Sequence, residues 1–200
     1  RGLGFSFGST PVLHDVDLDL PWGAVTAIAG PNGAGKSTLL EILAGVRTPS
    51  RGSVDRADEV ALVVQRPTTP ASLPVTVRDV VTMGTWSRRE KPPPRAQRRA
   101  RVEEALEEVE LAGLASRPFA ALSGGQRQRV LIAQGLARRA RIFLLDEPAA
   151  GLDSLGRDAT RRVLAAAAAR GAAVACVSHD DDSIDAADLV VRLEAGRRRA

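Results

Sequence analysis

Residues 30–38 read Gly-Pro-Asn-Gly-Ala-Gly-Lys-Ser-Thr. This stretch matches the pattern G-x-x-x-x-G-K-[ST], whose glycines let the backbone wrap around a phosphate group so that several N–H groups point at it. The fixed positions of the pattern are Gly30, Gly35, Lys36 and Ser37. We expect Lys36 to reach the β- and γ-phosphates of a nucleotide and Ser37 to hold Mg²⁺. The alternative is an ordinary glycine-rich turn, but Lys36 is one of only two lysines in the chain, which argues against a chance match.

The residues on either side of the loop supply the context that the pattern requires. Residues 24–29 are apolar and predict a buried strand. The residues after the loop are apolar at helical spacing: Leu39, Ile42, Leu43 and Val46. The order strand, loop, helix places a helix N-terminus, with its partial positive charge, at the phosphate.

A second motif lies at residues 122–126, which read Leu-Ser-Gly-Gly-Gln. Ser123 followed three residues later by Gln126 is a capping box, and it precedes a helical pattern formed by Val130, Ala133 and Leu136. The motif is therefore consistent with a simple helix start. A serine and two glycines at a helix N-terminus also form a potential anion site, which would be the second in this chain.

A third motif joins two acidic residues to the end of a predicted strand. Residues 142–145 are apolar, as in a central parallel strand, and Asp146 and Glu147 follow at the carboxyl end, where open α/β sheets place their ligands. One carboxylate suits Mg²⁺ and its water shell, and the other suits deprotonation of an attacking water. His179 follows another apolar run, residues 172–177, and reaches a strand end in the same way.

From about residue 3 to 196, the chain resembles the nucleotide-binding subunit of an ATP-binding-cassette (ABC) transporter, with the motifs in the family's order. The resemblance implies that Asp146 is the Walker B aspartate, Glu147 the catalytic glutamate, His179 the switch histidine and Gln65 the glutamine that senses the γ-phosphate and Mg²⁺. The resemblance also implies that Phe7 occupies the position at which the family has an aromatic residue that stacks on adenine. The implied metal ligands are Ser37, Gln65 and Asp146. The other implied nucleotide-binding residues are Gly30, Pro31, Asn32, Gly33, Ala34, Gly35, Lys36, Ser37, Thr38, Ser123, Gly124, Gly125, Gln126 and Asp153.

The resemblance also implies the fold and the assembly. It predicts an α/β P-loop NTPase fold with a RecA-like parallel-sheet core, an antiparallel β subdomain and an inserted helical subdomain. We expect one ABC ATPase domain over residues 1–200, with residues 1–66 and 120–200 forming the core and residues 67–119 the helical subdomain. The implied ligands are ATP and Mg²⁺. A second copy is expected to bind head to tail, so that residues 123–125 of one chain complete the ATP site of the other.

Composition agrees with one folded domain that does not span a membrane. The chain has 200 residues, 44% of them hydrophobic, which is enough for one good core, and it has no apolar run near 20 residues. We expect no signal peptide, and the lone Cys176 is interpreted as a small core residue of a cytosolic protein. Asp15, Asp17 and Asp19 alternate with apolar residues through Leu20, which favours a half-buried strand over a metal cluster.

Two classes of function remain open for a cassette ATPase. One is the motor of a membrane transporter, peripheral on the cytoplasmic face of the membrane and bound to permease subunits. The other is a soluble ABC-type ATPase in DNA repair or on the ribosome. DNA-repair relatives carry a long coiled coil between the positions of Gln65 and the motif at residues 122–126, and residues 66–121 of this chain are too short to form one. Ribosomal relatives carry two cassettes in one chain, whereas this chain has one. We therefore favour the transporter and expect no nucleic-acid partner.

Residues 73–86 are similar to the same region of zinc, manganese or iron importers. No Cys/His cluster exists here, so we expect this subunit not to bind the metal itself and to meet a substrate-binding protein only indirectly. The apolar residues of this region either contact the permease or fill the helical core; they are Val75, Val77, Val80, Val81, Met83 and Trp86. The basic run over residues 88–101 is either a solvated surface or a site for anionic lipid headgroups.

Overall fold

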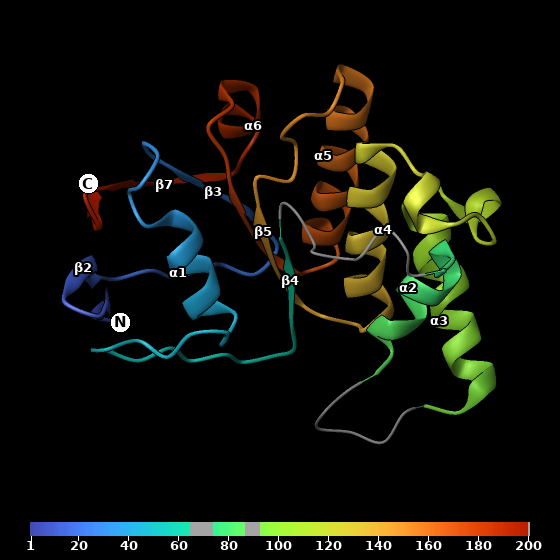
Figure 1. The fold of residues 1–200 in the computed structure, drawn as a ribbon, viewed down its shortest axis with the longest axis horizontal. Helices are drawn as coiled ribbons and strands as arrows, with labels where there is room; N and C mark the ends of the chain where they lie inside the picture. The colour runs from blue at the N-terminus through green and yellow to red at the C-terminus, as the bar shows by residue number, and fades with distance from the viewer. Residues whose placement is uncertain (65–73, 87–92, 200) are drawn as a thin grey trace.

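The computed structural model describes residues 1–64, 74–86 and 93–199 (Figure 1). Its described residues form a six-stranded sheet in the order β4-β5-β6-β3-β7-β8. The strands are β3 (Val25–Ala29), β4 (Val60–Val63), β5 (Ile142–Asp146), β6 (Ala173–Val177), β7 (Leu189–Glu194) and β8 (Arg197–Arg199). The first five strands in this order, from β4 to β7 and including β3, are parallel, and β8 pairs antiparallel with β7. The predicted parallel core is therefore present, and the strand after residue 24 joins it directly.

A separate antiparallel pair contains β1 (Leu3–Phe7) and β2 (Thr10–Val16). The predicted strand through Leu20 is wrong beyond Val16, although its apolar residues still alternate with exposed aspartates. The pairing ends at Leu3 opposite Val16, and Asp15 has a left-handed φ of 54°, so the ladder does not continue. The carboxylate of Asp17 instead accepts a 2.7 Å hydrogen bond from the backbone N–H of Gly2.

The sheet separates two groups of helices. Because side chains alternate along a strand, Leu144 of β5 packs in a cluster with α1 (Lys36–Leu43), whereas Phe143 and Leu145 pack with α4 (Gly124–Ala137) and α5 (Ser154–Ala169). Figure 1 shows α1 on one side of β4 and β5 and the other two helices on the opposite side. The helix after the loop is shorter than predicted, since Gly45 (φ 79°) follows its end and Val46 is exposed.

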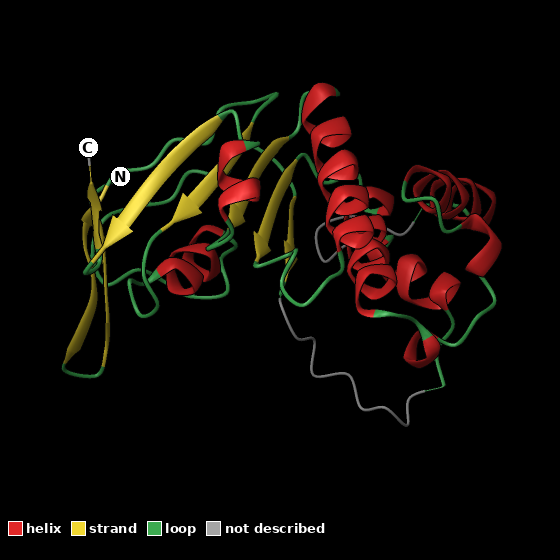
Figure 2. Cartoon of the chain, turned by 90° about the horizontal axis from the view of Figure 1, so that it is seen from above, coloured by secondary structure: helices red, strands yellow, loops and turns green. Residues whose placement is uncertain are grey.

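The short helix α6 (Asp181–Asp185) lies against β3, and the other helical segments gather beyond α4, away from β1 and β2 (Figure 2). They are α2 (Val77–Gly84), α3 (Arg95–Glu108) and the 3₁₀ turns η1 (Ala112–Leu114) and η2 (Phe119–Ala121). Three of the apolar residues considered for a permease contact are buried in the core of this region: Val77, Val80 and Val81. Of the other candidates, Val75 before α2 and Met83 near its end are half-buried, and Trp86, which follows α2, is 56% exposed. No helix in the described ranges has the length and apolar character needed to cross a membrane.

Candidate nucleotide site

The loop between β3 and α1 is held by close backbone packing. Gly30 has a φ of 147°, and a Cβ atom there would lie 2.0 Å from the carbonyl oxygen of Leu193 in β7. Gly35 precedes α1 with a φ of 95°, and a Cβ atom there would lie 2.8 Å from Leu13 Cδ2 in β2. No side chain caps α1, so its first N–H groups are left for a ligand. This is a cradle that only glycine can form.

Lys36 supplies the positive charge of this cradle. The residue is only 6% exposed, and its Nζ donates hydrogen bonds to the carbonyl oxygens of Gly30 (2.7 Å) and Pro31 (2.9 Å). An ammonium group has three N–H donors, so one is left without a partner among the described residues. A nearly buried cation with an unused donor, beside an uncapped helix N-terminus, fits the phosphates of ATP.

The side chains of Asp146, at the end of β5, and Ser37, in the first turn of α1, lie next to each other. The Ser37 hydroxyl donates a hydrogen bond to the Asp146 carboxylate at the end of β5. Burial raises the pKa of Asp146, and the charges of Glu147 and Glu41 raise it further, while the Ser37 hydrogen bond and the Lys36 charge act in the opposite direction. The described residues contain no group of three or more His, Cys, Asp or Glu suited to a metal. Two oxygen ligands fit Mg²⁺, which keeps several waters and also binds substrate phosphates.

Glu147 lies directly beside His179. Its backbone is left-handed (φ 49°), and its N–H donates to the carbonyl oxygen of Val177 at 3.1 Å. The Glu147 side chain is 21% exposed, and its Oε1 lies 3.4 Å from Nδ1 of the more exposed His179. The adjacent strands β5 and β6 therefore bring together two residues that the sequence predicted separately at strand ends.

The second predicted anion site lies at the start of α4, on the opposite face of the sheet from α1. The capping box is present: the Ser123 hydroxyl accepts from the N–H of Gln126 (3.3 Å), and Gln126 Oε1 accepts from the N–H of Ser123 (3.1 Å). Ser123 and Gly124 are exposed. Asp153 caps α5 nearby by accepting from the N–H of Gly156 at 2.8 Å.

Phe7 has a partner that the sequence did not reveal. The Phe7 ring is 48% exposed and meets Phe5 edge to face, with ring centroids 5.0 Å apart. The Arg47 guanidinium lies over the Phe7 ring, 4.7 Å from its centroid, and pairs with Glu41. Arg47 follows α1 without any motif around it, and only its approach to β1 in space identifies it.

The remaining predicted site residues are placed as follows. Gln65 lies outside the described residues. In the loop before α1, Pro31, Asn32 and Gly33 are exposed and Ala34 is buried. Thr38, in the first turn of α1, and Gly125, at the start of α4, are half-buried.

The sheet order, the glycine cradle and the buried lysine define a P-loop nucleotide-binding α/β domain. The profile of the ABC transporter family matches residues 13–150. The chain belongs to this family, and it is an ATPase that binds ATP with Mg²⁺.

Relatives and solved structures agree with this assignment. The hemin import ATP-binding protein HmuV of Streptomyces coelicolor is 42% identical over 210 residues, covering 98% of this chain and 74% of the relative. The manganese transport system ATP-binding protein MntB of Listeria monocytogenes is 37% identical, covering 90% and 79%. A metal-chelate type ABC transporter in an inward-facing conformation has a TM-score of 0.89 at 31% identity, covering 100% of this chain and 80% of that one. The dimeric structure of a bacterial ABC transporter cassette has a TM-score of 0.86 at 26% identity, covering 100% and 95%. The transporter hypothesis is thus confirmed over the alternative in DNA repair.

Proposed function

We propose that this ATPase drives the import of a metal ion or metal chelate through a membrane permease. The support is the set of relatives described above, which are ATP-binding proteins of hemin and manganese transport systems. The subunit works as a peripheral protein on the cytoplasmic face of the membrane.

Each side chain of the site has one role in this proposal. Lys36 and the first N–H groups of α1 bind the β- and γ-phosphates, and Ser37 and Asp146 hold Mg²⁺. When bound, Mg²⁺ neutralises part of the charge that develops on the phosphates. Glu147 deprotonates the attacking water, and His179 positions Glu147 through the contact between Nδ1 and Oε1 at 3.4 Å.

The observation that carries the mechanism is the separation of the two anion sites by the sheet. We assign Lys36 and Ser123 of one chain to different ATP molecules, because α1 and α4 pack on opposite faces of the sheet. A head-to-tail pair of chains brings α1 of one copy against α4 of the other, with ATP between them. Hydrolysis removes the γ-phosphate that bridges the copies, and the opening of the pair drives the permease between its two states.

Light scattering tests this pairing. Glu147→Gln with ATP should accumulate as a dimer, because ATP binds but is not cleaved. Adding Ser123→Arg should return the protein to monomer, since it places bulk and misdirected charge at the start of α4. Ser116→Arg, the same change at another exposed serine, is the matched control and should leave the dimer intact. Equal dimerisation of the Ser123→Arg and Ser116→Arg proteins would show that the trans arrangement is wrong.

The permease contact is proposed beside α2. The surface there offers exposed Trp86 and a 520 Å³ groove between α2 and α3, lined by Thr82, Val102 and four arginines. These features suit a permease segment with both apolar and acidic residues. With Cys176 replaced by serine, a cysteine at Thr82 should crosslink to cytoplasmic loops of the permease in an ATP-dependent way. Crosslinks formed at Arg157 and not at Thr82 would show that the permease binds the opposite side of the protein and that the proposed contact beside α2 is wrong.

A further inference from the structure

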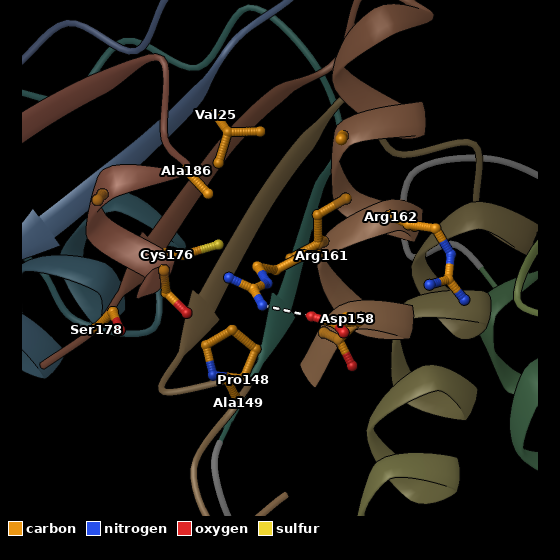
Figure 3. A pocket seen from close by; sticks show the side chains of 14 residues that line it. Val25, Pro148, Ala149, Asp158, Arg161, Arg162, Cys176, Ser178 and Ala186 are labelled. Atoms are coloured by element: carbon orange, nitrogen blue, oxygen red, sulfur yellow. Dashed lines mark hydrogen bonds and ion pairs between the residues drawn. The ribbon is translucent and has the colours of Figure 1, made fainter. Parts of the chain in front are cut away.

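A cavity separate from the nucleotide site lies on the face of the sheet opposite α1. It has a volume of about 470 Å³ and lies between strands β3 and β6, helix α5 and α6 (Asp181–Asp185). Figure 3 shows Cys176 with its sulfur turned into this space, and Pro148 and Ala149 closing it from the loop after β5. None of the residues assigned to the nucleotide lines it.

Small side chains leave this space open. Ala27, Ala149, Ala165 and Ala186 line it from four different segments, where longer side chains would fill it. Its volume falls within the range of small-molecule sites in proteins, roughly 300–1,000 Å³. The cavity therefore has room for an organic ligand.

The lining specifies the chemistry of that ligand. Most of the wall is apolar, and burial raises the pKa of the Cys176 thiol to about 12, so the thiol is neutral. Arg161 projects over the space and donates to the Asp158 carboxylate and to the carbonyl oxygen of Asp182 (3.2 Å). A guanidinium has five N–H donors, so others remain for a ligand. Arg162 pairs instead with Glu110 outside the cavity (3.7 Å), and its side chain is directed away from the space in Figure 3. The remaining donors of Arg161 are therefore the cationic groups that face the space, and they favour a single anionic group on the ligand.

The cavity also contacts the backbone that carries the Glu147–His179 pair. Pro148 and Ala149 directly follow Glu147, and Ser178 directly precedes His179. A molecule packed against these lining residues therefore restrains both sides of the contact between Nδ1 and Oε1.

We propose that this cavity is a regulatory site for a small, largely apolar molecule with one anionic group, and that its occupancy slows ATP hydrolysis. The regulatory part rests on the role proposed for Glu147, whereas binding to the cavity does not. Failure of the catalytic role of Glu147 would leave ligand binding unchanged, so the two proposals can be told apart.

The probe is anilinonaphthalene sulfonate, an apolar fluorophore with one sulfonate group. We expect it to bind the intact protein with enhanced fluorescence and to lower ATP hydrolysis at least about twofold, roughly 0.4 kcal/mol by the rate constant relation. Ala165→Leu fills the cavity from α5 and should abolish both effects. Ala166→Leu, the adjacent exposed position outside the cavity, is the matched control and should keep both.

Two further measurements locate the probe and its charge. Chloromercuribenzoate reacts with the only thiol, forming a sulfur–mercury bond while the thiol proton and chloride leave, and saturating fluorophore should slow this labelling of Cys176. Arg161→Met should weaken binding of the sulfonate probe but not of neutral phenylnaphthylamine, which lacks the anionic group.

Four results would overturn the proposal. Equal binding by Ala165→Leu and Ala166→Leu, or unprotected Cys176, would place the probe elsewhere. An unchanged rate of hydrolysis at saturating probe would remove the regulatory role. Inhibition that persists in Ala165→Leu would show that the probe acts outside the cavity.

Discussion

The N-termini of α1 and α4 are built in opposite ways. Helix α1 begins after Gly35 without a side-chain cap, and the nearly buried Lys36 lies in its first turn. Helix α4 begins with a complete capping box, in which Ser123 and Gln126 use each other's backbone N–H groups, and its start is exposed. The uncapped helix can offer its donors to a ligand, whereas the capped one is stable alone and offers a preformed surface. The difference indicates a primary phosphate site at α1 and a completing site at α4.

The largest expected effect separates chemistry from binding at the primary site. Glu147→Gln keeps the shape of the side chain but loses the base, so hydrolysis should fall about 10²- to 10⁴-fold, or roughly 3–5 kcal/mol of barrier. ATP binding should survive, because Lys36 and Ser37 are unchanged. Phosphate release and nucleotide binding measured on the same preparation check both parts. Hydrolysis above half the wild-type rate would remove Glu147 from the catalytic role.

The next effect tests the contrast between the two helices directly. Lys36→Met keeps the side-chain stem but removes the charge, and it should weaken ATP binding by the monomer about 100-fold, near 3 kcal/mol for a lost charged hydrogen-bond donor. Ser123→Ala should cost about 1 kcal/mol of stability through the lost cap. Its ATP affinity as a monomer should match wild type in equilibrium titration. A similar loss of affinity in both variants would contradict the division of labour.

The packing of the loop before α1 can be tested by two matched glycine substitutions. Gly30→Ala forces a Cβ atom to within 2.0 Å of the backbone of Leu193, whereas Gly33→Ala meets no atom within 4 Å. Both need a positive φ, but the value of 147° at Gly30 is less accessible to alanine than the 79° at Gly33, so strain and overlap both act against Gly30→Ala. Urea unfolding should show a loss about 1–3 kcal/mol greater for Gly30→Ala than for Gly33→Ala. Equal losses of unfolding free energy would show that strand β7 shifts at little energetic cost to accommodate the added Cβ atom.

The smallest expected effect concerns the aromatic pair on β1. Arg47→Ala removes the cation over Phe7, an interaction of about 0.5–1 kcal/mol at an exposed site. It also opens the ring face to a nucleotide base. We therefore expect nucleotide affinity to change by only about two- to fivefold, within that energy. Phe7→Ala serves as the comparison, and Arg47→Ala should have no effect in that background if it acts through the ring.

Local patterns were sufficient to predict the elements that make the primary site. The loop before α1 and the strand ends at Asp146 and His179 follow from glycine spacing and from apolar runs of strand length. The capping box at Ser123 was likewise predicted and is present. These features depend on residues close together in the chain, which is why a sequence pattern can reveal them.

Features that depend on distant segments were not predicted. Around Asp17 and Asp19, exposed aspartates still alternate with partly buried apolar residues. However, β1 does not extend opposite these residues, so no strand forms. Val77 and Val81 were candidates for a permease contact, yet α4 covers them. The stacking of Arg47 on Phe7 joins residues that no local pattern links. Each outcome was decided by which segments meet in space.

The placement of α1 and α4 on opposite faces also has a genetic consequence. In a head-to-tail pair, a chain with Lys36→Met loses its own ATP site but still completes the site of its partner. A chain with Ser123→Arg does the reverse. Two inactive alleles expressed together therefore produce mixed dimers with one site built entirely from unaltered residues. We expect such alleles to complement each other in one cell, whereas two alleles altered at Lys36 do not.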